Sequence, residues 1–189
     1  MPEPTTRRGK DTKARIVELA AALMYERGVN ATSIDDILAA SGTGKSQTYH
    51  YSSGKEELVS EVLRHQLGLV LDQQSLFPLD TWQGIAAGFQ AMADMQQNQR
   101  GYRGCPLGSI AGEVLHQSDF LRGRTADAFS RWESFLADGL RTMQTTGLLR
   151  GDADPDALAG ATIAVLQGGT CSPPRSATYA PCAMPSPWH

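Results

Sequence analysis

The chain has few cysteines, and their spacing excludes the sites that cysteine usually builds. Cys105, Cys171 and Cys182 are the three cysteines among the 189 residues. An odd number without a paired C-x-x-C spacing argues against both a zinc finger and a disulfide framework. Cys171, Cys182 and His189 also fit no common metal site by their spacing. We therefore expect free thiols and no metal.

Long apolar runs and a strong excess of charge are lacking too. No stretch is long enough to span a bilayer, and the N-terminus lacks the apolar core of a signal peptide. The formal net charge is −3 and the pI is about 5.8, which argues against a protein that coats nucleic acid with its whole surface. The sequence predicts a cytoplasmic protein with no membrane partner.

Catalytic groupings and strand patterns are also absent. None of the histidines has a nucleophile or carboxylate at a spacing that implies a shared reaction; they are His50, His65, His116 and His189. Apolar residues recur at intervals of three and four rather than alternating, which indicates helices. We expect an all-α protein that is not an enzyme and needs no cofactor.

What the chain does have is a pair of helices around a glycine turn. The first helix opens at Ser33, with Asp36 at the spacing of a capping box. The apolar pattern stops at Gly42, and glycine suits a sharp turn between crossing helices. A second helix is expected over residues 45–51, whose polar side chains can bond base edges and phosphate oxygens but are poor at building a core. The pair predicts a helix-turn-helix that reads DNA.

From Ser41 the chain reads SGTGKSQTYHYSSGKEEL, which resembles the second-helix pattern of the tetracycline-repressor (TetR) family of bacterial transcription regulators, roughly AGVSKGTLYHYFxxKExL. The matching positions are Gly42, Lys45, Tyr49, His50, Tyr51, Lys55, Glu56 and Leu58. Thr48 and Ser52 depart from the pattern, because the family usually has an aliphatic residue and a phenylalanine there. An apolar helix that ends at Gly28 extends the resemblance upstream.

The resemblance implies which side chains meet DNA. We expect Ser46 and Gln47 at base edges and the other recognition residues mainly at phosphates. The full set is Thr32, Ser33, Thr43, Lys45, Ser46, Gln47, Tyr49, His50 and Lys55. A basic N-terminal segment beside the helix pair is expected to contact phosphates as well; its cations are Arg7, Arg8, Lys10, Lys13 and Arg15.

The triplet Gly44-Lys45-Ser46 also ends like a phosphate-binding loop, G-x-x-x-x-G-K-[ST]. Ala39 stands where the opening glycine of that motif would be. The residues before the triplet form an amphipathic helix, whereas a phosphate-binding loop follows a strand. Both observations disfavour nucleotide binding.

Helical spacing continues behind this segment. A long helix over residues 56–74 is expected first, and later helices are expected to begin near Thr81, Pro106 and Pro155. Another helix, which ends at Gly147, is indicated by apolar residues at intervals of three or four: Phe129, Trp132, Leu136, Leu140 and Met143. The resemblance implies a ligand-binding and dimerisation domain that takes a small apolar effector. Apolar side chains that either line its cavity or form its core are Trp82, Phe89, Met92, Met95, Leu107, Ile110, Phe129, Trp132 and Phe135.

The last twenty residues are rich in proline, which forbids a helix of useful length; the prolines are Pro173, Pro174, Pro181, Pro185 and Pro187. The resemblance implies two C-terminal helices per subunit in a dimer interface, and the sequence shows only the first, from near Pro155. We therefore expect a weakened homodimer. The tail is either a native extension or the product of a frameshift near Gly169.

These observations predict a basic disordered arm (1–10), a helix-turn-helix domain (11–55), a helical ligand-binding and dimerisation domain (56–169) and a disordered tail (170–189). We expect a transcriptional repressor that binds a palindromic double-stranded DNA operator as a homodimer and leaves it when the effector binds. The alternatives are a truncated or frameshifted family member with impaired dimerisation and regulation, and a helical ligand carrier or enzyme.

Overall fold

The computed structural model describes residues 5–42, 54–98 and 104–171, without the side chains of residues 96–98 and 170–171. These ranges hold seven α-helices and no strand, so the all-α prediction is confirmed for them. The helices are α1 (Arg7–Arg27), α2 (Ile34–Ser41), α4 (Lys55–Gln74), α5 (Trp82–Asn98), α6 (Pro106–Val114), α7 (Asp119–Thr145) and α8 (Pro155–Cys171). The predicted helix over residues 45–51 and the proline-rich tail lie outside the described residues.

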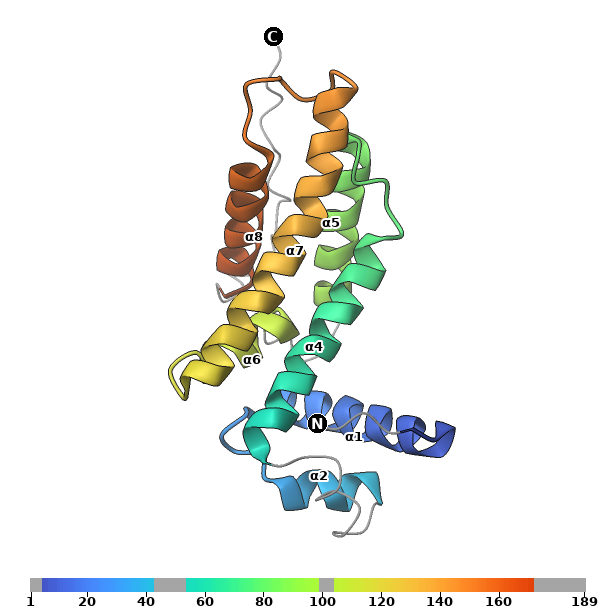
Figure 1. Cartoon of the computed structure of the whole chain (residues 1–189), viewed down its shortest axis with the longest axis vertical. Helices are drawn as coiled ribbons and strands as arrows, with labels where there is room; N and C mark the ends of the chain where they lie inside the picture. The colour runs from blue at the N-terminus through green and yellow to red at the C-terminus, as the bar shows by residue number, and fades with distance from the viewer. Residues whose placement is uncertain (1–4, 43–53, 99–103, 172–189) are drawn as a thin grey trace.

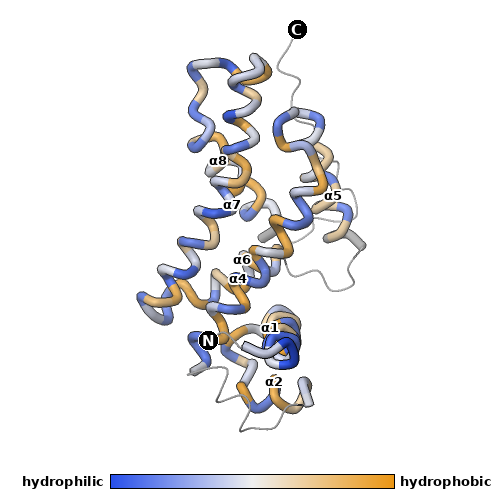
Figure 2. The backbone as a smooth tube through the Cα atoms, turned by 45° about the vertical axis from the view of Figure 1, so that its right-hand side comes forward, coloured by the Kyte–Doolittle hydropathy of each residue, from blue (hydrophilic) through white to orange (hydrophobic). Residues whose placement is uncertain are grey.

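The helices form two regions that share α4 (Figure 1). The head consists of α1, α2 and the first half of α4. The body consists of the rest of α4 with α5, α6, α7 and α8, and α7 packs against both α4 and α8. Apolar and polar stretches alternate along each helix in Figure 2, as amphipathic helices around a shared core require.

Most helix ends fall where the sequence predicts them. Gly28 ends α1 with φ 93°, and its N–H donates to the Met24 carbonyl over 2.9 Å. The capping box at Ser33 opens α2, and Asp154 caps α8 through the N–H groups of Asp156 and Ala157. The start of α7 is earlier than its apolar spacing indicates, because Ser118 caps the helix by accepting from the Leu121 N–H over 3.2 Å.

The expected disordered arm over residues 1–10 is wrong for its last four residues. The Thr6 hydroxyl accepts from the Gly9 N–H over 3.1 Å, so α1 begins at Arg7 and runs on without a break. A threonine at this position satisfies one of the four N–H groups that a helix start leaves without a partner. The basic side chains of Arg7, Arg8 and Lys10 are therefore exposed on a helix rather than on a flexible arm.

The body core centres on Trp132 of α7, whose side chain is fully buried. Its indole Nε1 donates to Gln74 Oε1 over 3.0 Å, and Gln74, at the end of α4, is itself 2% exposed. The Gln74 amide nitrogen meets the Met92 sulfur at 3.7 Å, so three helices share one buried polar contact. A buried amide with partners on both sides fixes how these helices meet.

Two glycines let the connection between α4 and α5 pack against helices. A Cβ on Gly139 of α7 would lie 2.3 Å from the Leu79 carbonyl oxygen, and one on Gly84 of α5 would lie 1.9 Å from the Pro78 carbonyl oxygen. Both distances are below any real Cβ contact, so only glycine fits at these two positions. The connection is thereby held close to the far end of the body.

None of the described helices is both long and apolar enough to span a bilayer. Within the same residues, no group of three or more histidine, cysteine or acidic side chains is placed to hold a metal ion.

Candidate functional site

The N-terminal end of α2 carries the first of the predicted DNA contacts. Ser33 is exposed, and its hydroxyl donates to Asp36 Oδ2 over 2.5 Å while it accepts from the Asp36 N–H over 3.1 Å. The Ser33 hydroxyl, then its backbone N–H, and the charge of Arg27 hold the pKa of Asp36 below its ordinary value of 3.8. Ser33 thus sits on a helix start that the sequence itself stabilises.

Thr32 does not belong with the DNA contacts, which corrects the sequence prediction. Its side chain is 1% exposed, and its hydroxyl lies 2.8 Å from the Gly28 carbonyl oxygen and 3.3 Å from the Leu23 carbonyl oxygen. A hydroxyl that donates into the end of α1 cannot reach a nucleic acid in this conformation. Thr32 instead fixes the path of the chain between α1 and α2.

The residues expected to read bases lie outside the described ranges. They are Thr43, Lys45, Ser46, Gln47, Tyr49 and His50. Lys55 is described, and it is the half-buried first residue of α4, directly after Gly54. The structure describes the helices on both sides of residues 43–53. α2 ends at Ser41, and Gly42 follows it in a left-handed conformation with φ 64°.

The basic face of α1 includes fewer cations than the sequence predicts. Lys13 is 6% exposed, and its Nζ lies 3.5 Å from Glu61 Oε1 on α4. Glu61 also pairs with Arg64, so one carboxylate receives cations from two helices. Lys13 therefore joins α1 to α4 and is not available to a phosphate, whereas Lys10 and Arg15 remain exposed.

Seven of the nine apolar residues proposed for an effector cavity lie in or against the body core. Leu107, Ile110 and Trp132 are fully buried, and Met92 is 7% exposed. Phe89, Phe129 and Phe135 are partly buried and pack against the same cluster, and the Phe129 and Trp132 rings stack with their centroids 6.2 Å apart. The structure brings side chains from α5, α6 and α7 together at this place.

Trp82 and Met95 stand apart from that group, since each is 48% exposed. The Trp82 indole Nε1 donates to the Leu148 carbonyl over 3.1 Å, in the connection between α7 and α8. That connection lies at the end of the body opposite the head (Figure 1). Trp82 thus stabilises the far end of the body, and we keep only the other seven residues as candidates for an effector site.

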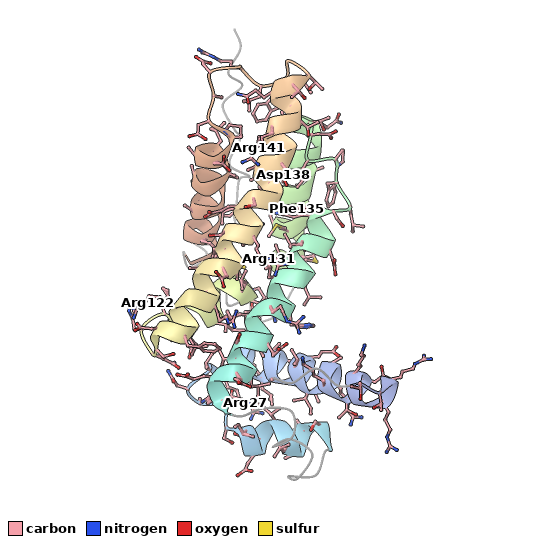
Figure 3. All side chains as sticks on the ribbon, viewed as in Figure 1. Arg27, Arg122, Arg131, Phe135, Asp138 and Arg141 are labelled. Atoms are coloured by element: carbon pink, nitrogen blue, oxygen red, sulfur yellow. The ribbon has the colours of Figure 1, made fainter. Side chains whose placement is uncertain are left out.

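A separate groove of about 530 Å³ opens between α4 and α7, and none of the nine predicted residues lines it. Arg131 lies there between α7 and α4 (Figure 3). The other charged residues that line it are Glu57, Glu61, Arg64, Arg124 and Asp127. The lining thus holds three arginines and three carboxylates, and because their charges balance, the groove favours neither anions nor cations.

The residues that sequence reasoning missed lie where head and body meet. Glu113 of α6 and Gln117, three residues after α6 ends, bond the chain between α1 and α2, and the Tyr25 hydroxyl of α1 donates to the Gly104 carbonyl over 2.8 Å. No local pattern could have indicated these bonds, because their partners are 79 or more residues apart in the chain.

Both the head and the body resemble known protein families. Residues 16–62 match the family model described as "Bacterial regulatory proteins, tetR family", and residues 82–172 match "Tetracyclin repressor-like, C-terminal domain". The transcriptional repressor DhaR of Mycobacterium sp. strain GP1 is 27% identical over 163 residues, which cover 82% of this chain and 79% of DhaR.

Solved structures agree with the fold. The reduced form of E. coli NemR superposes with a TM-score of 0.74 at 21% identity, over 85% of this chain and 86% of that one. A transcriptional regulator from Saccharomonospora viridis, solved in complex with choline, gives a TM-score of 0.62 at 27% identity, over 84% and 82% of the two chains. With one model matching the head and another matching the body, the chain belongs to the TetR family and is a DNA-binding transcriptional regulator.

Proposed function

We propose that this regulator is a repressor that binds a palindromic operator as a homodimer and leaves the DNA when a small apolar molecule enters the body. The name of the relative DhaR supports repression, and the choline complex of the Saccharomonospora regulator supports a body that takes small molecules. The observation that carries the proposal is the position of α5 in the body.

The backbone of α7 runs close to those of α4, α6 and α8, and α4 runs close to α6, whereas α5 approaches its neighbours less. Large side chains bridge the wider space, among them Phe89 and Met92 from α5 and Trp132 from α7. Methionine and phenylalanine side chains change rotamer at small cost, so a ligand can replace their mutual contacts. We place the effector there, against the seven residues retained above.

The proposal of a homodimer is supported by apolar residues on the exposed face of α8. Val165 is 75% exposed and Leu158 is 39% exposed, and the small residues Ala161 and Ala164 are exposed between them. Apolar and small side chains at helical spacing allow a second helix to approach closely. We propose that this face meets the same face of a second copy, and that residues 172–189 decide how strong the dimer is.

Selection of bound fragments from a random DNA library tests the proposal directly. Gln47→Ala is expected to relax base preference at one operator position by about 1–3 kcal/mol, whereas Lys55→Ala should weaken all sites alike and lower the salt slope by about one. A palindromic consensus is expected from the wild-type protein. Failure to enrich any sequence would overturn operator binding.

Effector release has its own test, with choline and the dye anilinonaphthalene sulfonate as probes. The dye is expected to bind the body with rising fluorescence and to lower operator affinity in the same concentration range. Choline is the comparison probe, because it lacks the large aromatic surface that the dye can bury in an apolar site. If the dye fills the body while operator affinity stays constant, ligand-controlled release is wrong for this chain.

A further inference from the structure

The turn between α1 and α2 has backbone N–H groups that neither helix can satisfy. α1 ends at Arg27 and α2 begins at Ile34, so the N–H groups of Val29 and Asn30 lie beyond the reach of both helical ladders. A side chain from the body supplies the acceptor. Glu113 Oε2 accepts from the Val29 N–H over 2.8 Å and from the Asn30 N–H over 3.4 Å.

Gly28 makes this approach possible. Its φ of 93° favours glycine, and a Cβ built there would lie 3.1 Å from both carboxylate oxygens of Glu113. Any other residue would therefore press on the carboxylate as well as strain the backbone. The turn is shaped to receive an acidic side chain from outside the head.

A second bond comes from Gln117, three residues after α6 ends. Gln117 Nε2 donates to Asn30 Oδ1 over 3.1 Å and lies 3.0 Å from the Glu113 carbonyl oxygen. Tyr25 reaches from α1 to Gly104, two residues before α6 begins. The head is thus tied to α6 by Glu113 and to the chain on either side of α6 by Tyr25 and Gln117; of these contacts only that of Glu113 has a charged acceptor.

The other side of α6 belongs to the body core. Leu107 and Ile110 are fully buried there, and both belong to the proposed effector site. One helix of nine residues therefore touches the proposed ligand space on one side and holds the head by Glu113 on the other.

We propose that Glu113 is a positioning residue: its carboxylate holds the turn after Gly28 and thereby sets the angle of the head on the body. The inference deepens the proposed function, on which its DNA readout rests. Its amide-exchange readout does not depend on DNA, so the two can fail separately.

The first measurement is hydrogen exchange at the Val29 amide in full-length Glu113→Ala, Glu113→Gln and wild-type protein. Loss of a bond to a charged acceptor is expected to speed exchange by about tenfold to a hundredfold in Glu113→Ala. Glu113→Gln keeps an oxygen acceptor and should fall between the two. Glu26→Gln is the matched control, because Glu26 is exposed on the last turn of α1 and its removal also takes one negative charge from this end of the molecule.

The second measurement is operator spacing. With half-sites found by selection, the wild-type protein is expected to prefer one spacing strongly, since two fixed heads fit one separation. Glu113→Ala should reduce that preference over sites lengthened by two base pairs at least about fivefold, while leaving the base preference within each half-site unchanged. Tryptophan fluorescence, to which Trp82 and Trp132 of the body contribute together with Trp188, should show an unchanged unfolding midpoint.

Several results would overturn the inference. Unchanged exchange at Val29 in Glu113→Ala would show that the carboxylate does not hold the turn. Faster exchange with an unchanged spacing preference would reduce Glu113 to a local structural role. Equal effects of Glu26→Gln and Glu113→Gln on spacing would assign the effect to charge alone. Should the wild-type protein select no DNA, the proposed function fails and the exchange measurement still decides whether Glu113 holds the turn.

Discussion

The head and the body are stabilised in different ways. The body buries a large aromatic side chain, Trp132, with its one polar atom bonded to Gln74. Among the described residues of the head, 5–42 and 54–64, the buried core holds smaller aliphatic side chains and no aromatic one, with Lys13 and Thr32 buried among them. Its core includes Leu58 and Val62 from the first half of α4, and its turn between α1 and α2 is bonded by Glu113 of the body. The body is held around one buried aromatic residue, whereas the head combines an aliphatic core with a bond from the body.

The largest effect is expected from the centre of the body. Trp132→Ala should lower the free energy of unfolding by about 3–5 kcal/mol, because it leaves a cavity and takes away the donor to the buried Gln74 oxygen. Urea unfolding followed by far-UV circular dichroism measures this. Trp132→Phe keeps most of the packing and should cost clearly less. Equal losses for the two variants would mean that the hydrogen bond, rather than packing, stabilises the body.

A smaller effect is expected where the α4–α5 connection packs on α7. Gly139→Ala should destabilise the protein by about 1–3 kcal/mol, since its Cβ would collide with the Leu79 backbone. Gly123→Ala, on the same helix but in open space, should instead stabilise by up to about 1 kcal/mol through helix propensity. Thermal unfolding of the pair gives the comparison. A loss at both positions would contradict the assigned packing.

Local capping in the head comes next. Ser33→Ala should cost about 1 kcal/mol at neutral pH, because it removes the cap of α2 and the main bond to Asp36. The pKa of Asp36 is lowered in the folded protein, so this contribution is present above the ordinary value of 3.8 and is lost as pH falls through the lower, folded value. Urea unfolding at a series of pH values should show the difference between variant and wild type narrowing in acid, while the part due to the bond from the Asp36 N–H to Ser33 remains. A constant difference down to the lowest pH would contradict the role of the carboxylate.

The smallest expected change concerns salt. Lys10→Ala should lower the slope of log affinity against log salt by about one if its helix turn contacts a phosphate, whereas Lys13→Met should leave the slope unchanged. The reason is that Lys13 is buried beside Glu61, while Lys10 is exposed. Fluorescence anisotropy on a selected operator measures both. A slope that falls for Lys13→Met would restore it to the phosphate contacts.

Features that depend on neighbouring residues in the sequence could be predicted, whereas features that depend on contacts between distant residues could not. The caps at Ser33 and Asp154 and the glycine after α1 could be found because each acts within a few residues. Thr6 was missed as a cap because the basic residues after it are typical of a flexible arm as well. The first ten residues of α7 were missed because they are mostly polar, with only Leu121, Thr125 and Ala128 buried.

The residues of the candidate site also fall into those that the sequence could predict and those that depend on packing between distant segments. Family resemblance gave the DNA-reading positions, which lie outside the described residues, and it wrongly included Thr32, whose burial depends on how α1 and α2 pack. Aromatic and methionine content predicted the effector residues but could not separate Trp82, which reaches Leu148 across 66 residues of sequence. Glu113 could not be found at all, since its role as the acceptor for the Val29 and Asn30 N–H groups appears only when α6 lies against the turn.

The bond from Glu113 to the turn after Gly28 limits how this regulator can be rebuilt into a biosensor. Chimeras that join one protein's DNA reader to another's sensing region commonly assume that the two exchange freely. Here a graft of residues 1–74 onto a foreign helical region would need a carboxylate at the position of Glu113 and a glycine at its own position 28. A designer who transfers both together keeps the geometry, and one who transfers either alone leaves two backbone N–H groups without an acceptor.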